Sequence, residues 1–296
     1  MTIFLTGASG LLGHALAKAF LRKGWGVHGT VNQLPVQMDG LRIHNLDLST
    51  SGELTNTLSN IGPQVIVNAA ALSVPATCQI HPQLSHALNV ILPNELARYA
   101  AQEGIHLIHY STDMVFDGKS GNYSENDSTH PKNLYGEHKL ESEKRVQDIS
   151  PNTSVVIRLP LLTGNSLSGK RSMHEALWLS WKIGESTKHF EDEWRQPVSV
   201  SNVADLTVEL IQNPDIHGLF HWAGADQLNR WELGQHIARK LGVPDDLLQK
   251  TLSADFPEFK DRPKNLTLDC SKLKARVQTE PAPFKDQLVE MVVPNP

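Results

Sequence analysis

The sequence predicts an α/β protein in which a doubly wound parallel sheet is joined to a smaller, interwoven α/β region. Short apolar, strand-like runs alternate with amphipathic helical stretches through the first half of the chain, a glycine-rich turn follows the first run, and the alternation becomes irregular after Pro160. Alternating strands and helices are typical of a parallel sheet with helices on both faces. We therefore expect one domain over residues 1–160 and a second, mainly over 161–296, with elements at about 198–224 returning to the first.

The expected elements follow from the periodicity of the apolar residues. Short runs rich in Val, Ile and aromatic residues predict strands, and longer stretches with apolar residues three and four positions apart predict helices. The expected strands are residues 2–6, 26–31, 41–45, 64–68, 105–111, 155–159 and 218–222. The expected helices are one ending near residue 23, then 51–59, 83–102, an aromatic-rich helix within 161–193, 200–210 and 230–241.

The composition limits the classes of function. A chain of 296 residues, 40% hydrophobic and 20% charged, is typical of a globular protein with a large core. A net charge of −5 without a Lys/Arg run argues against nucleic acid or an anionic membrane as the main partner. No apolar segment approaches the ~20 residues of a membrane span and no signal peptide precedes the first strand, so we expect the cytoplasm. Cys78 and Cys270 form no CxxC pair, the histidines form no HExxH set, and no metal site is expected.

A glycine-rich turn follows the first expected strand and precedes the first helix. Its spacing is Gly-x-x-Gly-x-x-Gly. Glycine lets the backbone turn tightly and lie against a pyrophosphate, whose charge is stabilised by the helix amino terminus. A simple tight turn is the alternative, but the position directly after an opening strand favours dinucleotide binding. The cofactor-binding residues expected here are Gly7, Gly10, Leu11, Leu12 and Gly13.

Polar residues end two further expected strands. In a parallel α/β sheet, ligands bind beyond the carboxyl ends of the strands, so both ends are expected near a cofactor. Turn capping is the alternative for the hydroxyls of Ser111 and Thr112, and a hydroxyl can both cap and face a ligand. Strand alternation implies that only one of these two faces the substrate. The residues concerned are Asn68, Ala69 and Ala70 in the first strand end and Tyr110, Ser111, Thr112 and Asp113 in the second.

Tyr135 and Lys139 lie four residues apart in a helical stretch. Residues at this spacing share one helix face, so the phenol and the ammonium would point into the same site. A nearby positive charge lowers the pKa of a Tyr from its ordinary value near ~10, and such a Tyr can exchange a proton at neutral pH. An exposed helix carrying an unrelated Tyr and Lys is the alternative. The glycine turn and the hydroxyl motif in the same chain favour the catalytic interpretation.

Taken in order, these motifs resemble the extended short-chain dehydrogenase/reductase superfamily: Gly-x-x-Gly-x-x-Gly, Asn-Ala-Ala-Ala from Asn68, Ser-Thr-Asp-x-Val-Phe-Asp-Gly over 111–118, and Tyr-x-x-x-Lys. The segment 111–144 is similar to the dTDP-4-dehydrorhamnose reductase group. FHWAG at 220–224 and RPKNLTLDCSKL at 262–273 look closest to a branch that includes the regulatory β subunit of methionine adenosyltransferase. The resemblance covers nearly the whole chain. It implies a Rossmann-like fold, NADP or NAD as cofactor, a nucleotide-sugar substrate and a homodimer as one candidate assembly.

The resemblance also implies roles in the reduction of a ketone, which needs a hydride donor, a proton donor and support for the carbonyl oxygen. The nicotinamide would supply hydride and Tyr135 the proton. Lys139 would lower the pKa of the phenol and hydrogen-bond the nicotinamide ribose. Thr112 matches the hydroxyl that orients the carbonyl, with Ser111 as the neighbouring alternative. Asp113 would assist that hydroxyl or the proton path.

The adenosine end of the cofactor is expected at the second and third strands. Asp47, which is followed by Leu48, resembles the acidic residue that contacts adenine in this superfamily; a helix-capping carboxylate before Ser49 is the alternative. Asn32 follows the second strand, where NAD-preferring proteins carry an acid for the ribose 2′-OH. With no acid to repel a 2′-phosphate and no Arg to attract one, we expect dual use or a mild preference for NADP.

The substrate side is expected at EDEWRQPVSVS, residues 191–201, which resembles the Arg-x-Pro stretch of the family. Arg195 offers a planar fork suited to a diphosphate, and Trp194 offers a flat face for a base or sugar. An ion pair between Arg195 and one of the acids at 191–193 is the alternative. The other cations considered in this half of the chain are Lys170, Arg171 and Arg262.

Two departures from the reductase pattern keep two hypotheses open. Met114 stands where the rhamnose reductases usually carry Tyr, and RLPLLTG at 158–164 replaces a stretch resembling RTSWLYG. Both changes leave the hydride chemistry intact and concern the sugar. The first hypothesis is an NAD(P)H-dependent reductase of the 4-keto group of a nucleotide-linked deoxysugar. The alternative is an NADP-binding regulatory subunit of another enzyme with reduced catalytic activity.

Overall fold

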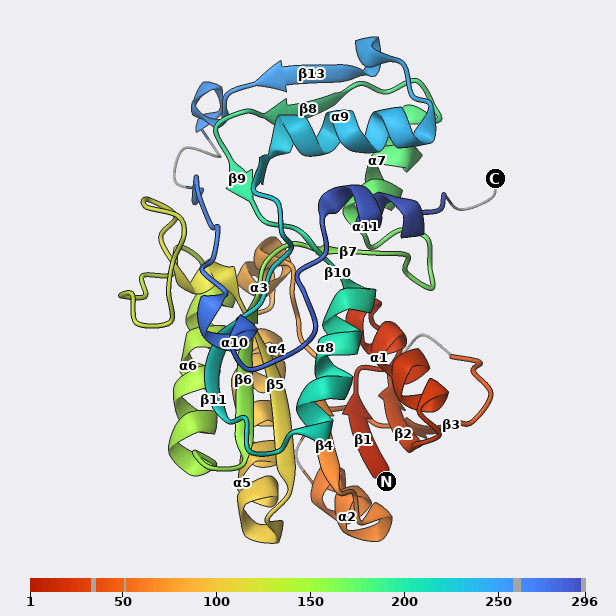
Figure 1. Ribbon diagram of the computed structural model, residues 1–296, viewed down its shortest axis with the longest axis vertical. Helices are drawn as coiled ribbons and strands as arrows, with labels where there is room; N and C mark the ends of the chain where they lie inside the picture. The colour runs from red at the N-terminus through yellow and green to blue at the C-terminus, as the bar shows by residue number, and fades with distance from the viewer. Residues whose placement is uncertain (33–35, 51, 258–261, 294–296) are drawn as a thin grey trace.

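The computed structural model describes residues 1–32, 36–50, 52–257 and 262–293. Its centre is a parallel sheet of seven strands in the order β11-β6-β5-β4-β1-β2-β3 (Figure 1). The order reverses between β1 and β4, so the predicted doubly wound fold is confirmed. The strands are β1 Thr2–Thr6, β2 Gly26–Val31, β3 Leu41–Asn45, β4 Val65–Asn68, β5 His106–Thr112, β6 Ser154–Leu159 and β11 Gly218–His221.

Helices cover both faces of this sheet because its strands carry apolar side chains in both directions. In β1, Ile3 and Leu5 pack into one core cluster and Phe4 into the other, as strand alternation requires. The first cluster lies under α1 Leu11–Arg22 and α8 Val200–Gln212, which also pack against each other. The second lies under α2 Glu53–Ile61, α5 Leu92–Glu103 and α6 Leu134–Ile149.

The helix expected over residues 83–102 is present as one continuous helical run over 82–103 that contains a π-helical segment. The chain forms α3 Pro75–Ile80, α4 Pro82–His86, a π-helical segment Ala87–Ile91 and then α5. Pro93 has no N–H to continue the α-helical ladder, which accounts for the π-helical turn just before it. The wider π turn holds Asn89, whose side chain accepts from the N–H of Leu72 at 3.1 Å and donates to its carbonyl at 3.0 Å. Asn89 thereby fixes the loop after β4. The expected start of the preceding helix, Ser51, lies outside the described residues, and α2 begins at Glu53.

A second layer is built from the carboxyl half of the chain. In Figure 1, β8, β13 and α9 lie together at the top, away from the main sheet. β8 and β13 pair in parallel, and α9 packs on both. Short pairs β7 with β10 and β9 with β12 lie between the two layers. The elements are β7 Leu162–Thr163, α7 Met173–Trp181, β8 Thr187–Phe190, β9 Trp194–Arg195, β10 Val198–Ser199, β12 Leu228–Asn229, α9 Arg230–Leu241, β13 Leu248–Thr251, α10 Ser271–Lys274 and α11 Phe284–Glu290.

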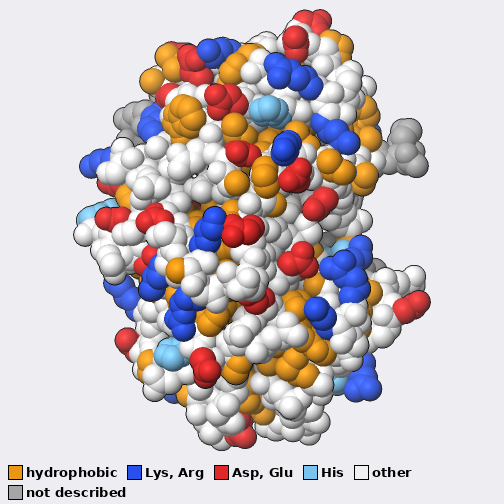
Figure 2. Space-filling model, in the orientation of Figure 1, with side chains coloured by type: hydrophobic (Ala, Val, Ile, Leu, Met, Phe, Trp, Pro, Cys, Tyr) orange, Lys and Arg blue, Asp and Glu red, His pale blue; other side chains and the backbone are white. Residues whose placement is uncertain are grey.

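The charges on the surface are mixed in sign, as expected from a sequence without a Lys/Arg run. Figure 2 shows acidic and basic side chains interspersed over one face, with apolar side chains scattered among them. Within the described ranges, no helix combines the length and the apolar character needed to cross a membrane.

Candidate functional site

A cavity of about 500 Å³ is lined by the carboxyl ends of the parallel strands and by residues of the second layer. This is the edge at which open α/β sheets bind ligands. The structure brings together here most of the site residues predicted from the sequence: Gly7, Gly10, Leu11, Leu12, Asn32, Leu48, Asn68, Ala69, Ala70, Tyr110, Ser111, Thr112, Asp113, Tyr135, Lys139 and Arg195.

The glycine turn between β1 and α1 packs closely against the loop after β4 and lines the cavity. Gly7 has a φ of +70°, and a Cβ on it would come within 3.0 Å of the backbone nitrogen of Ala70. Gly10 precedes the first turn of α1 and supplies no capping side chain. The first N–H groups of this 12-residue helix therefore face the cavity without a side-chain acceptor, an arrangement that suits an anion.

Two predicted cofactor residues do not line the cavity. A Cβ on Gly13 would lie 2.0 Å from the carbonyl oxygen of Gly7, so Gly13 allows α1 to pack against the turn. Asp47 is exposed and accepts hydrogen bonds from the N–H of Ser49 at 2.9 Å and from its hydroxyl at 2.6 Å. Asp47 thus caps a turn at Ser49 and not a helix, since α2 begins at Glu53, and its neighbour Leu48 lines the cavity.

Tyr135 lies at the start of α6, where Asn133 caps the helix by accepting from the N–H of Gly136 at 2.9 Å. The phenol is 8% exposed and hydrogen-bonds the hydroxyl of Thr112. Thr112 also accepts from the N–H of Met114 at 3.2 Å, so this hydroxyl both caps a turn and faces the site.

The predicted direction of the Tyr135 pKa is wrong for this structure. Burial raises the pKa of the phenol above its ordinary value, and the charge of Asp113 raises it further, while the hydrogen bond with Thr112 acts in the opposite sense. The Lys139 ammonium does not offset these effects, because it is directed toward His109. A raised pKa keeps the phenol protonated at neutral pH, which is the state that can donate a proton.

Lys139 is buried, with 2% of its surface exposed, and its Nζ lies 3.3 Å from Nε2 of His109. Burial lowers the pKa of Lys139 to about 7, against the opposing effect of the Glu143 carboxylate. His109 also makes a 3.0 Å contact with the amide of Asn68, which accepts from Thr6 in β1 at 2.6 Å. A polar chain therefore links Lys139 across the sheet to the strand that leads into the glycine turn. His109 thus makes polar contacts with Asn68, Ser142 and Lys139.

Ser111 and Thr112 have different partners. Ser111 donates its hydroxyl to Glu143, which forms a buried ion pair with Arg158 at 2.7 Å. Thr112, by contrast, contacts the phenol of Tyr135. The alternation expected along the strand is therefore present, since the Ser111 hydroxyl is engaged on α6 and the Thr112 hydroxyl lies at the site.

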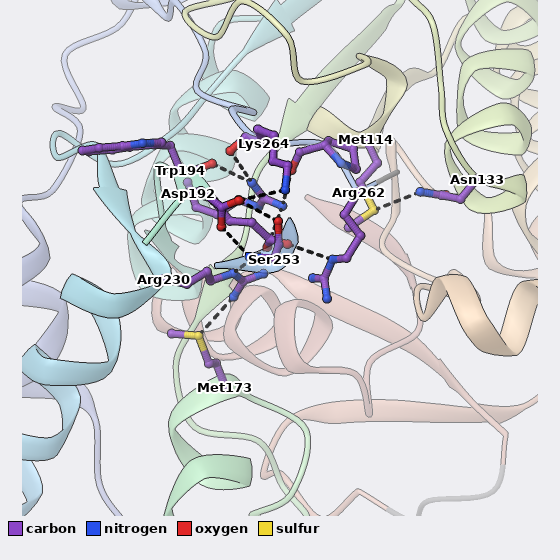
Figure 3. Close-up of polar contacts among 12 residues, drawn as sticks. Met114, Asn133, Met173, Asp192, Trp194, Arg230, Ser253, Arg262 and Lys264 are labelled. Atoms are coloured by element: carbon purple, nitrogen blue, oxygen red, sulfur yellow. Dashed lines mark hydrogen bonds and ion pairs between the residues drawn. The ribbon is translucent and has the colours of Figure 1, made fainter. Parts of the chain in front are cut away.

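The second layer contributes an arginine cluster, which we define as Arg195, Arg230 and Arg262 around the fully buried Glu193 (Figure 3). Arg195 is 3% exposed and donates to the carbonyls of Trp194 at 2.7 Å and Pro263 at 3.1 Å. Its pairing with Glu193 at 3.4 Å matches the ion-pair alternative considered for this residue. The Trp194 ring points away from the cluster in Figure 3.

Asp113 faces this cluster across the cavity. Burial raises the pKa of its carboxyl to about 6, while the positive charges of Arg195 and Arg230 act to lower it. Arg195 and Arg230 both line the same cavity as Tyr135.

Arg230 and Ser9 are two of the lining residues that the sequence interpretation missed. Asn229 and Glu232 form a capping box that marks the start of α9, so the sequence signals a helix at Arg230 but not the direction of its side chain. Arg171, which was among the cations considered, lines the cavity, and Lys170 does not.

Comparison with known proteins places the chain among relatives of similar length. The profile of the RmlD substrate binding domain matches residues 1–295. Methionine adenosyltransferase 2 subunit beta of Bos taurus is 33% identical over 99% of this chain and 87% of its own length. A probable low-salt glycan biosynthesis reductase of Haloferax volcanii is 28% identical over 98% of this chain and 97% of its own.

Solved structures share the fold over nearly the whole chain. A hypothetical dTDP-4-dehydrorhamnose reductase of Sulfolobus tokodaii superposes with a TM-score of 0.85 at 27% identity, over 99% of this chain and 100% of that one. The dTDP-4-dehydrorhamnose reductase of Bacillus anthracis, solved in complex with NADP, gives a TM-score of 0.83 at 20% identity, over 97% of each chain. Because the family profile spans residues 1–295, the chain belongs to the RmlD substrate binding domain family.

Proposed function

We propose that this protein reduces a keto group of a nucleotide-linked sugar with NADPH or NADH, and that the group is the 4-keto function of a deoxysugar, as in the dTDP-4-dehydrorhamnose reductases. One observation carries the proposal: Thr112, Tyr135, Lys139 and the glycine turn line the same cavity. Membership of the RmlD substrate binding domain family supports it.

The cavity fits a nicotinamide dinucleotide. The pyrophosphate would lie against the glycine turn and the amino terminus of α1. Asn32 and Leu48 would border the adenosine, and Asn68, Ala69, Ala70 and Tyr110 the middle of the cofactor. The bound nicotinamide would supply a hydride to the substrate carbon.

The side chains would complete the reduction. Thr112 and Tyr135 would donate hydrogen bonds to the carbonyl oxygen, and the protonated phenol would deliver its proton as negative charge develops there. Lys139 would turn from His109 to the ribose and the phenol, where its ammonium stabilises the phenolate that remains. Asp113, with a pKa of about 6, lies close enough to influence the phenol through its charge.

The test is turnover of purified protein. NADPH oxidation should depend on a dTDP- or UDP-linked 4-keto sugar, and the product should carry a new hydroxyl at C4. Binding of both NADPH and the sugar nucleotide with no oxidation of NADPH would contradict the proposal.

A second candidate is an NADP-binding regulatory subunit. The 33% identity to methionine adenosyltransferase 2 subunit beta over nearly the whole chain favours it. This function predicts stable association with a separate catalytic subunit and a change in that subunit's activity. Size-exclusion chromatography with light scattering, which also tests the proposed homodimer, would separate self-association from such a complex.

The division into residues 1–160 and 161–296 is likewise our proposal, testable by limited proteolysis.

A further inference from the structure

A chain of hydrogen bonds runs from the loop after β4 to the backbone of Lys139, and its direction is fixed at both ends. At the first end, the backbone N–H of Ala70 donates to the hydroxyl of Thr6 at 3.0 Å. That hydroxyl gives its own proton to Asn68 at 2.6 Å, so the Asn68 atom that it meets is the amide oxygen. At the other end, the hydroxyl of Ser142 donates to the backbone carbonyl of Lys139 at 2.7 Å.

The directions of these bonds determine which nitrogen of His109 carries the proton. With the amide oxygen of Asn68 on Thr6, the amide NH₂ faces Nδ1 of His109 at 3.0 Å. An NH₂ group only donates, so Nδ1 is the acceptor and the proton of the neutral ring lies on Nε2. This Nε2–H lies 3.1 Å from the hydroxyl oxygen of Ser142, which is free to accept because its own proton is already used.

Lys139 therefore meets a donor in His109. Its Nζ lies 3.3 Å from Nε2 of the ring, and only 2% of Lys139 is exposed, so the contact is buried. An ammonium group has three donors and no acceptor, and at this distance it would face another N–H. A neutral amine has a lone pair that can accept from the ring. The hydrogen-bond chain thus favours the amine form of Lys139.

The other charges around Lys139 do not reverse this preference. The Glu143 carboxylate acts to raise the pKa of Lys139, but it is paired with Arg158 at 2.7 Å. Burial outweighs it and lowers the pKa of Lys139 to about 7, in agreement with the hydrogen-bond argument. The remaining titratable groups at this end of the cavity are the Tyr135 phenol and the two groups whose charges act on it, Asp113 and Cys78.

We propose that Lys139 is a neutral amine in the ligand-free protein at mildly alkaline pH, held in that form by the His109 ring, and that binding of the nicotinamide cofactor adds one proton to it. The proton comes from solvent through the cavity that Lys139 lines, and it bonds to the lone pair of Nζ. The ribose hydroxyls of the cofactor and the phenol oxygen of Tyr135 then accept from the ammonium.

The inference rests on the proposed function and deepens it, because it states how the same site is regulated: the cation at the site forms only together with the bound cofactor. His109 has the part of a positioning residue, since it acts on the reaction through Lys139 and does not line the cavity.

The experiment measures the protons taken up when NADPH binds to the full chain. At pH 8.5 the 2′-phosphate of NADPH, with a pKa of about 6, is already ionised and contributes no proton. Calorimetry in Tris and in bicine, two buffers that differ in ionisation enthalpy, gives the number of protons. We expect close to one proton per chain. By linkage, the Kd for NADPH should rise about eightfold between pH 7.5 and pH 8.5.

Three variants identify the group that takes up the proton. Lys139→Met should bind NADPH without proton uptake. Asn68→Asp keeps the side-chain shape but places an acceptor on Nδ1 of His109, so the ring proton moves there and Nε2 can accept from an ammonium. Lys139 then keeps its proton without the cofactor, and uptake should fall below half a proton. Ser142→Ala is the matched control: it alters the same chain and leaves Asn68 unchanged, so uptake should stay close to one proton.

The outcomes are distinct for the inference and for the proposed function. NADPH binding without proton uptake in the wild type, or undiminished uptake in Lys139→Met, overturns the inference. Undiminished uptake in Asn68→Asp removes His109 from it. Should Asn68→Asp fail to fold, ¹⁵N NMR of the wild-type histidines decides, because a proton on Nδ1 of His109 contradicts the role given to the ring. A wild-type protein that does not bind NADPH at all contradicts the proposed function instead.

Discussion

The Lys139 ammonium lies 3.3 Å from Nε2 of His109, in a place where both side chains are buried. Burial, together with the Lys139 charge, lowers the pKa of His109 well below its ordinary value, so its imidazole is neutral. The cation that the proposed reaction needs thus lies against a neutral ring in the ligand-free chain. Such an arrangement costs folding free energy and leaves Lys139 ready to move to a stronger partner.

Lys139→Met should stabilise the ligand-free protein at low pH. Burial lowers the pKa of Lys139 from 10.5 to about 7, so between these values the unfolded chain binds a proton that the folded chain lacks. The resulting penalty is full below about pH 7 and disappears as the pH rises to 10.5. We expect the variant to melt about 4 °C or more above the wild type at pH 6, with a gain that shrinks toward pH 10. Thermal melts across pH check this, and the exposed Lys144→Met is the control; a gain independent of pH would contradict the assignment.

Tyr135→Phe should remove turnover and keep cofactor binding. The phenol oxygen is the proposed proton donor, and the ring itself fills a buried position that Phe can occupy. We expect kcat to fall by about 10²- to 10⁴-fold while the Kd for NADPH changes little. Steady-state kinetics and fluorescence titration measure the two quantities, with Tyr99→Phe on α5 as the control. Full kcat in the Phe variant would remove Tyr135 from the mechanism.

Glu143→Gln and Glu141→Gln should differ sharply in stability. Glu143 and Arg158 are 1% and 3% exposed, so the first change leaves a buried guanidinium without its counter-charge. We expect a loss of about 3–5 kcal/mol in the free energy of unfolding. Glu141 pairs with Arg145 on the same helix at 40% exposure for each side chain, and its loss should cost about 0.5 kcal/mol or less. Urea unfolding measures both free energies, and equal losses would show that burial does not determine how much an ion pair contributes to stability.

Gly13→Ala should damage the glycine turn, whereas Gly26→Ala should be tolerated. A Cβ on Gly13 would lie 2.0 Å from the carbonyl oxygen of Gly7, which cannot retreat without displacing the turn. We expect a loss of about 3 kcal/mol or more, together with weakened NADPH binding. The nearest atom to a Cβ on Gly26 is 3.7 Å away, so that change should stay within about 0.5 kcal/mol. Chemical denaturation and NADPH titration test both, and a stable, NADPH-binding Gly13→Ala protein would refute the packing role.

The cofactor site should accept both nicotinamide dinucleotides, with a mild preference for NADP. Asn32 lines the cavity just beyond β2, where an acid would bind the ribose 2′-OH and repel a 2′-phosphate. Asn32→Asp should therefore shift the preference toward NAD. Calorimetry with both cofactors tests the prediction, which a hundredfold preference of the wild type for NAD would refute.

The sequence predicts the fold well wherever one periodic signal decides an element. β2 and β3 have the boundaries expected from their apolar runs. The helix expected over 83–102 is present, but the apolar pattern does not show that its hydrogen bonding changes to a π turn just before Pro93, which lacks an N–H.

The site is predictable where spacing along one element brings residues together. Tyr135 and Lys139 share a helix face, and Thr112 ends a strand at the same edge of the sheet. Spacing along one element does not predict contacts with residues from distant segments. His109 draws the Lys139 ammonium away from the phenol, and backbone carbonyls at 263–264 take the donors of Arg195. Arg230 reaches the cavity from a helix whose capping signal carries no information about side-chain direction.

β11 closes the edge of the main sheet by pairing with β6, although about 60 residues separate them in the chain. A fragment ending at Pro160 would leave β6 as an unpaired edge, and its Val155, Val156 and Ile157 are fully buried in the intact protein. Apolar edges of this kind recruit strands from other chains. During synthesis, the growing chain therefore carries an aggregation-prone edge until His221 has left the ribosome, and the first half should depend on chaperones for that interval.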